Sequence, residues 1–208
     1  MRSSEQFRPL IRYNGFMKIV LTSCGIINKD VREKFFALFD KAPEELHILY
    51  ITTAVDGEDG DKSWVDEEFA TILDLGIRKE NITEYKIGES DVDLEEFDAI
   101  YMMGGNSLYL AKKMYGYGFE APLKRALASG VVYVGSSAGS IVAGVTLAPA
   151  AVYGDEPVDN KDYPCLNLVE AAIFPHAEKR AEEYAAWLKG WSGKAILLEN
   201  GDGVVIER

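Results

Sequence analysis

The stretch VVYVGSSAGS, residues 131–140, indicates the kind of fold this chain adopts. Four apolar, mostly β-branched residues lead into a turn of glycine and serine, and small residues continue to 144. This order is typical of a buried strand, a tight turn and a helix that packs closely on the strand. The turn has the pattern Gly-x-Ser-x-Gly with Ser137 at its tip. Ser137 is therefore a candidate nucleophile, and the helix N-terminus behind it would stabilise an oxyanion.

Strand-like and helix-like segments alternate on the N-terminal side of this motif. Strands are predicted over 18–22, 46–52, 82–87, 98–103 and 131–134. Helices are predicted over 31–39, 64–75 and 121–129, and a further one follows the turn at 104–106 and runs to 115. This alternation predicts βαβ units, and therefore an α/β fold with a three-layer, doubly wound, mostly parallel sheet and helices on both faces. Ligands bind at the carboxyl ends of such strands, so the turns at 23–25, 104–106 and 135–137 should converge on one site.

A serine nucleophile needs a base, and the chain contains two histidines. His47 lies near the start of a predicted strand, away from the carboxyl edge, and we interpret it as structural. His176 directly follows a strand-like run and is the candidate base. Glu199, at the end of the run 195–198, is the first candidate for the acid that orients the histidine. Two further carboxylates remain open as alternatives: Glu178 and Asp202.

The same turns supply candidates for oxyanion and substrate binding. The backbone N–H of Ala138 follows the nucleophile, and Gly105 could present a second N–H from the neighbouring turn. Asn106 in that turn is a candidate substrate contact. Arg180, four residues after His176, could bind a substrate carboxylate, although an ion pair with a neighbouring glutamate explains it as well. Asp155 could bind a substrate amino group from the long irregular segment 147–165, which is typical of a lid or binding loop.

Composition limits the classes of function. The 208 residues predict a single domain over 17–208, with 1–16 as an N-terminal appendage. The net charge of −12 disfavours nucleic acid as a partner. No apolar run is long enough for a membrane span, and no secretory signal precedes the first strand. Two cysteines form neither a disulfide framework nor a zinc cluster, so we expect a cytoplasmic protein without a metal or cofactor. The expected partner is a small peptide substrate, bound by a monomer or homodimer.

Five short motifs, taken together and in this order, resemble the dipeptidase E family of serine peptidases. They are Gly-Gly-Asn at 104–106, Gly-Ser-Ser-Ala-Gly at 135–139, Leu-Asn-Leu at 166–168, Pro-His at 175–176 and Leu-Glu at 198–199. The resemblance runs from about Met17 to the C-terminus and implies a class I glutamine-amidotransferase-like fold. It also implies a Ser137–His176–Glu199 triad, an oxyanion hole at Gly105 and Ala138, and hydrolysis of dipeptides with an N-terminal aspartate, without a cofactor.

The chain departs from that family's pattern beside the site. The family usually has an aromatic residue where Ser136 stands and Asn-Pro-His where Phe174 precedes Pro-His here. An aromatic residue also usually follows the histidine, where this chain has Ala177. These differences leave the triad intact and leave the substrate open.

Three other functions remain as alternatives, and a fourth, glutaminase activity, is disfavoured. A glutaminase of this fold would need a cysteine at the elbow, where this chain has Ser137. An α/β-hydrolase esterase would need its acid between Ser137 and His176, where the candidates are Asp155, Asp159, Asp162 and Glu170. A cyanophycinase, which cleaves aspartyl–arginine units, is a closer alternative. A non-catalytic binding protein of the same fold is the alternative from a different class.

Overall fold

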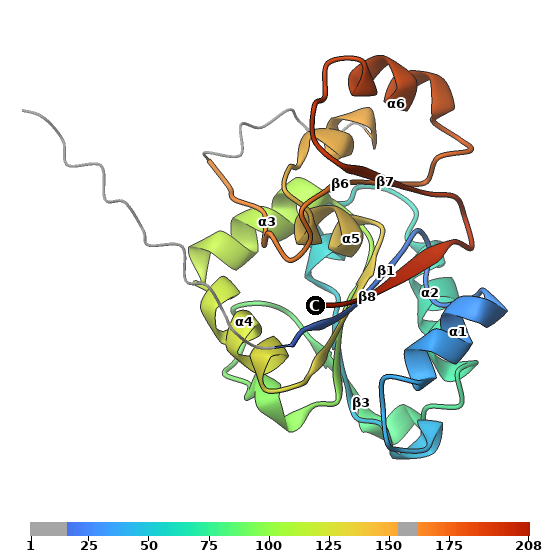
Figure 1. Ribbon diagram of the computed structural model, residues 1–208. Coiled ribbons are helices and arrows are strands. Elements are labelled where there is room, and N and C mark those ends of the chain that lie inside the picture. The colour runs from blue at the N-terminus through green and yellow to red at the C-terminus, as the bar shows by residue number, and fades with distance from the viewer. Residues whose placement is uncertain (1–15, 154–161) are drawn as a thin grey trace, which may run out of the picture.

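A six-stranded sheet forms the middle layer of the structure, a computed structural model that describes residues 16–153 and 162–208 (Figure 1). The strand order is β3-β2-β4-β5-β1-β8. All neighbouring strands pair in parallel except β8, which runs antiparallel to β1. The strands are β1 Lys18–Thr22, β2 Ile48–Ile51, β3 Ile82–Tyr85, β4 Ala99–Met102, β5 Val132–Ser136 and β8 Gly203–Glu207. This arrangement confirms the predicted mostly parallel sheet.

Helices cover both faces of this sheet, as the sequence predicts. One face carries α1 (Lys29–Phe36) and α2 (Ser63–Leu73). The other carries α3 (Ser107–Gly116), α4 (Glu120–Ala128) and the short α5 (Ala138–Ala143). The strands are apolar on both faces because each face is buried: in β1, Val20 packs toward α1, while Ile19 and Leu21 pack in the opposite core. Short 3₁₀ helices span Pro43–Glu45, Thr53–Gly57, Lys79–Asn81, Leu94–Glu96 and Ala148–Tyr153.

A second, two-stranded parallel sheet lies beside α5. Its strands are β6 (Ala172–Pro175) and β7 (Ala195–Leu198), joined through α6 (Ala181–Leu188). Its core is aromatic: the rings of Phe174 and Tyr184 meet edge to face at 4.6 Å, and the Tyr184 hydroxyl donates to the carbonyl of Pro175 at 2.7 Å. Both strands end toward the carboxyl edge of the main sheet, so the segments that follow them reach the site.

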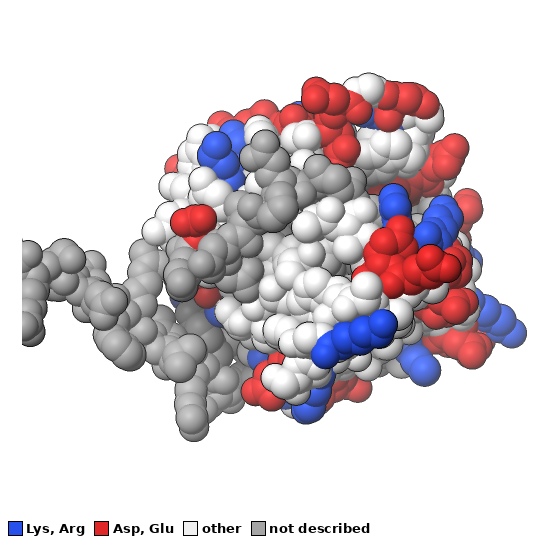
Figure 2. Space-filling model, turned by 90° about the horizontal axis from the view of Figure 1, so that it is seen from above, with Lys and Arg blue, Asp and Glu red and all other residues white. Residues whose placement is uncertain are grey.

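Two predicted segments are covered only in part. Within the expected loop 147–165, residues Ala148–Tyr153 form a 3₁₀ helix, whereas 154–161 lie outside the described residues. Most of the predicted appendage 1–16 also lies outside them. In the described part of the chain, no helix has the length and apolarity that a bilayer crossing requires. Figure 2 shows acidic and basic side chains around a largely uncharged middle on the face seen from above.

Candidate active site

Ser137 occupies a strained turn between β5 and α5. Its backbone has φ 46° and ψ −107°, which is unfavourable for a residue with a side chain. The glycines on either side make this turn possible. A Cβ on Gly135 would lie 2.7 Å from the carbonyl group of Gly139, and a Cβ on Gly139 would lie 2.0 Å from the carbonyl oxygen of Met102. The strain and the close packing are those of a nucleophile elbow.

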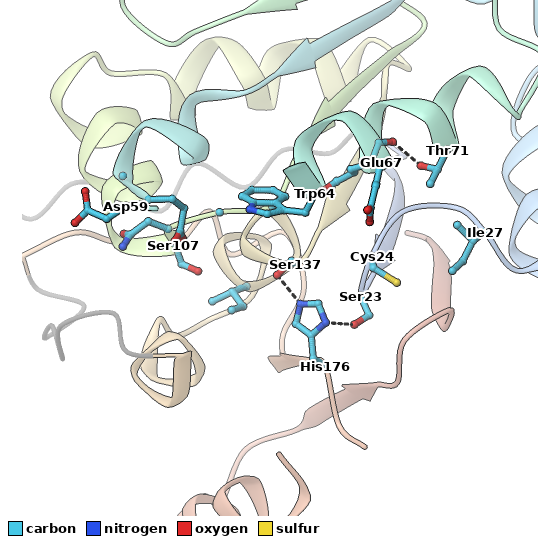
Figure 3. A pocket seen from close by; sticks show the side chains of 17 residues that line it. Ser23, Cys24, Ile27, Asp59, Trp64, Glu67, Thr71, Ser107, Ser137 and His176 are labelled. Carbon is cyan, nitrogen blue, oxygen red and sulfur yellow. Dashed lines mark hydrogen bonds between the residues drawn. The ribbon is translucent and has the colours of Figure 1, made fainter. Parts of the chain in front are cut away.

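The structure brings Ser137 and His176 together at this elbow. The Ser137 Oγ lies 2.8 Å from Nε2 of His176, which stands directly after β6 at φ 145° (Figure 3). The two residues come from different sheets, so the packing of β6 against α5 sets their distance. This geometry lets the imidazole accept the hydroxyl proton, which is the requirement for activating a serine.

The opposite nitrogen of the ring faces a side-chain amide and a hydroxyl. His176 Nδ1 lies 2.8 Å from Asn200 Oδ1 and 2.9 Å from Ser23 Oγ. The Ser23 hydroxyl is in turn 3.2 Å from Asn200 Oδ1 and donates to it. One set of protons satisfies this network: Nδ1 carries the hydrogen and Nε2 accepts from Ser137. Asn200 and Ser23 thus favour the tautomer that a general base needs.

Glu199, the first candidate for the acid, is not brought to the histidine. Its backbone N–H donates to Asp202 Oδ2 at 3.2 Å, and its carboxylate makes no hydrogen bond to the ring. The residue at Nδ1 is the next one along the chain, Asn200. Glu178, an alternative candidate for the acid, acts on the histidine indirectly: its carboxylate accepts the backbone N–H of Asn200 at 3.1 Å. Glu178 therefore positions the amide that positions the base.

The electrostatic environment keeps His176 neutral. Burial lowers the pKa of the imidazole below its ordinary value, because a cation is poorly solvated there. The hydrogen bond to Asn200 and the negative charge of Glu178 raise it in part, whereas Lys179 and Arg180 lower it further. A neutral imidazole at pH 7 can accept the proton of Ser137.

The two backbone groups expected to bind an oxyanion lie at this site. Ala138 is the first residue of α5, so its N–H belongs to the first turn, where no intrahelical acceptor exists. Gly105 lines the cavity and has φ 126°. A Cβ there would lie 2.6 Å from the backbone of Ala54, so glycine is needed for this turn. Their role in catalysis remains a prediction.

A cavity of about 770 Å³ opens above the serine and the histidine. Its size suits a short peptide. It is lined by the ends of β1 and β4, by the start of α2 and by residues 57–59. Four carboxylates and one indole are among the lining side chains: Glu58, Asp59, Glu67, Glu68 and Trp64. Cys24 also lines the cavity. Among the described residues that line the cavity, none is lysine or arginine.

Glu68 lies beside the elbow, since a Cβ placed on Gly104 would be 3.3 Å from both Glu68 Oε2 and Ser137 Cβ. Its Oε1 accepts the Tyr101 hydroxyl at 3.1 Å, and Oε2 is directed toward Gly104. Burial raises the pKa of Glu68, and nearby Ser136, Tyr101 and the Gly104 N–H offset only part of that effect. The Ser136 hydroxyl is itself fully buried, and its hydrogen bonding offsets part of the burial of both Glu68 and Tyr101.

The remaining predicted residues are distributed as follows. Asn106 lines the cavity, and its side chain also caps α3 by accepting the Tyr109 N–H at 2.7 Å. Arg180 forms an ion pair with Glu183 at 3.6 Å and is not among the residues lining the cavity. Asp155 lies outside the described residues.

Two other residues weighed in the sequence are placed away from the chemistry. His47 is exposed just before β2, with its backbone N–H bonded to Asp98, so it lies at the far end of the sheet. Cys165 is buried in the core, where burial raises the pKa of its thiol to about 12. In the described ranges, no three His, Cys, Asp or Glu side chains are grouped to hold a metal ion.

Sequence reasoning missed Ser23, Asn200, Trp64 and Glu68. Ser23 follows β1 in a turn that was expected at the site, which was the available signal. Trp64, Glu68 and Thr71 lie four and three residues apart on α2 and so share one helix face. Asn200 had no such signal beyond its place after β7.

Solved structures and curated proteins resemble this chain. A crystal structure described as a putative peptidase E protein from Listeria monocytogenes superposes with a TM-score of 0.72 at 22% identity, covering 93% of this chain and 98% of that one. Peptidase E of Streptomyces coelicolor is 33% identical over 106 residues, which are 50% of this chain and 42% of that protein. An uncharacterised peptidase of Listeria monocytogenes is 28% identical over 106 residues, covering 50% and 52%. The chain spans about half the length of these curated relatives.

The family model described as peptidase family S51 matches residues 19–208. It covers every element that builds the site, from β1 with Ser23 to the turn with Asn200, and it agrees with the resemblance that the sequence motifs carry. The chain therefore belongs to peptidase family S51.

Proposed function

We propose that this chain is a serine peptidase that hydrolyses short peptides through an acyl-enzyme intermediate on Ser137. The observation that carries the proposal is the 2.8 Å contact between Ser137 Oγ and His176 Nε2 on a strained elbow that lines a peptide-sized cavity. Membership of peptidase family S51 supports the same reaction. A protein that only binds a ligand would have no need of this strained backbone.

The reaction then proceeds in two halves. His176 takes the proton of Ser137 as its Oγ attacks the peptide carbonyl, and the N–H groups of Gly105 and Ala138 stabilise the oxyanion. The C–N bond breaks as His176 donates that proton to the leaving amine. Water, activated by the same imidazole, attacks the acyl-enzyme, and the acid leaves while Ser137 regains its proton.

We further propose that Asn200, held by Glu178, takes the orienting place that the family resemblance assigns to Glu199. An amide fixes the tautomer as a carboxylate does, but it carries no charge to stabilise the imidazolium. The histidine is then a weaker base than in a Ser–His–Glu triad. A triad with Glu199 would require the turn after β7 to shift so that its carboxylate replaces the amide.

The resemblance implies an N-terminal aspartate as the preferred substrate residue, and Asp-Xaa dipeptides are the first substrates to test. The cavity argues for a wider panel, because its lining carries four carboxylates that would repel the aspartate side chain. Glu-Xaa, Ala-Xaa, Lys-Xaa and β-Asp-Xaa dipeptides complete the panel.

A fluorophosphonate probe tests the proposal independently of the substrate. We expect Ser137 to be labelled in the wild type and the label to vanish in Ser137→Ala. Ser129→Ala, which removes a serine hydroxyl at the end of α4, is the matched control and should label normally. Absence of labelling together with no cleavage across the panel would exclude the proposed activity and leave a binding protein of this fold.

A further inference from the structure

We propose that Glu68 and Trp64 form a subsite beside Ser137 for a positively charged side chain of the substrate. The chain would then prefer lysine or arginine as the residue that is transferred to the serine. This inference rests on the proposed function, because it names the substrate class of the same site. It differs from the N-terminal aspartate that the family resemblance implies.

The first step is a convergence of three groups at Gly104. A Cβ placed on this glycine would lie 3.3 Å from Glu68 Oε2, 3.3 Å from Ser137 Cβ and 3.8 Å from the Cζ3 edge of the Trp64 ring. A carboxylate oxygen, the nucleophile's side chain and an indole thus surround one point. In Figure 3 the Trp64 ring, on α2, lies across the cavity from Ser137 and His176. The side chain of a residue acylating Ser137 can therefore reach the carboxylate and the indole.

The second step is the chemistry of those walls. A carboxylate binds a cation through an ion pair, and the indole beside it can pack against the aliphatic stem of a long basic side chain. Three further carboxylates line the cavity, at Glu58, Asp59 and Glu67, and no lysine or arginine is among its described lining residues. An acidic side chain would meet repulsion here, and the described residues that line the cavity offer no lysine or arginine to offset it.

The third step is the hydrogen bonding and burial of the Glu68 carboxylate. Its carboxylate is held by the Tyr101 hydroxyl on Oε1 and by the backbone N–H of Gly104, and Oε2 lies beside Gly104 and the elbow. Burial raises its pKa, and the surrounding donors do not offset that completely. A partly buried carboxylate whose donors do not fully offset its desolvation gains from a bound cation, because the cation restores stabilisation that water would give.

Diphenyl phosphonate analogues of lysine, norleucine and aspartate test this directly, since they phosphonylate an active-site serine with loss of phenol and need no turnover. Norleucine keeps the four-carbon stem of lysine but lacks the ammonium group. We expect the lysine probe to inactivate the wild type roughly 10- to 100-fold faster than the norleucine probe, the range of a hydrogen bond to a charged group. The aspartate probe should be the slowest. Equal rates for lysine and norleucine would overturn the inference. This includes the case in which the site recognises only the α-ammonium group, because both probes carry that group.

Two matched variants assign the effect to Glu68. Glu68→Gln keeps the size of the side chain and its bond with Tyr101, and it should bring the lysine-to-norleucine ratio close to one. Asp66→Asn removes the same charge from an exposed position on α2, outside the cavity lining, and should leave the ratio unchanged. An equal loss in both variants would show a general field of the acidic surface and refute a subsite at Glu68.

The outcomes separate the two proposals. Labelling of Ser137 by all three probes at the same rate leaves a serine peptidase and refutes the cationic subsite. Failure of all three probes and of the fluorophosphonate refutes the proposed function, and the subsite with it. The wild-type comparison of lysine with norleucine decides the question even if Glu68→Gln fails to fold.

Discussion

Gly139→Ala is predicted to slow the chemistry of Ser137 through a contact on the far side of the elbow. A Cβ on Gly139 would lie 2.0 Å from the carbonyl oxygen of Met102 and 2.9 Å from its carbonyl carbon. Real Cβ contacts begin at about 3.0 Å, so α5 must move away from β4 by about 1 Å. The first residues of α5 carry the Ala138 N–H and follow Ser137 directly, so they move with it. A misplacement of about 1 Å is able to cost roughly 100-fold in rate.

The expected change in stability combines two opposing effects. Alanine in place of glycine favours a helix by about 1 kcal/mol. Overpacking of a close-packed core costs about 1–3 kcal/mol. The net loss is therefore up to about 2 kcal/mol, which in a chain of this size lowers the melting temperature by a few degrees, at about 2–4 °C per kcal/mol.

The assay is the rate of fluorophosphonate labelling at Ser137 together with the melting temperature. Gly116→Ala is the matched control, because Gly116 ends α3 with open space where a Cβ would stand. It should label at the wild-type rate and melt at the same or a higher temperature. A Gly139→Ala protein that labels and melts like the wild type would refute the argument that close approach of α5 to β4 places the nucleophile.

Three further predictions concern protonation. Asn200→Asp should raise the pKa of His176, because it places a negative charge at Nδ1, and an NMR titration of the His176 ring signals checks this. Asn200→Ala should slow Ser137 labelling by roughly 10- to 100-fold, which the labelling rate checks. Because burial lowers the pKa of His176, the acid limb of kcat/KM should lie below pH 6.5, the ordinary value, and should move upward in Asn200→Asp; a limb above pH 6.5 in the wild type would contradict the effect of burial. Because the pKa of Glu68 is raised, its contribution to stability is present below its ordinary pKa of about 4.5 and is lost as the pH rises through the folded-state value. Glu68→Gln should therefore stabilise the protein at pH 7 and lose that advantage near pH 4. Melting curves at the two pH values check this.

The sequence predicts the sheet and the elbow because both depend on local patterns. The apolar runs before Gly104 and Gly135 identify β4 and β5, and glycine and serine at fixed spacing identify the turn that holds Ser137. The pairing of Ser137 with His176 followed from elimination, since the chain offers a single other histidine. These inferences needed no knowledge of how the second sheet packs.

The partners of His176 could not be predicted in the same way. Glu199 and Asn200 are adjacent, and which of them faces the imidazole depends on the turn between β7 and β8 rather than on chemistry. Glu68 was hidden for a different reason. In the sequence it is one of 34 acidic residues of the chain, and it becomes distinct only when the structure places the first half of α2 beside Gly104.

The antiparallel strand β8 has a consequence for how the molecule loses activity. It lies at the edge of the sheet, paired on one side with β1, and the turn before it carries Asn200 beside Ser23. Edge strands open more readily than central ones, because fewer buried contacts hold them. Fraying of β8 would release the imidazole while β5 and its serine remain in place. Inactivation by heat is then a local event that precedes the cooperative melting of the core.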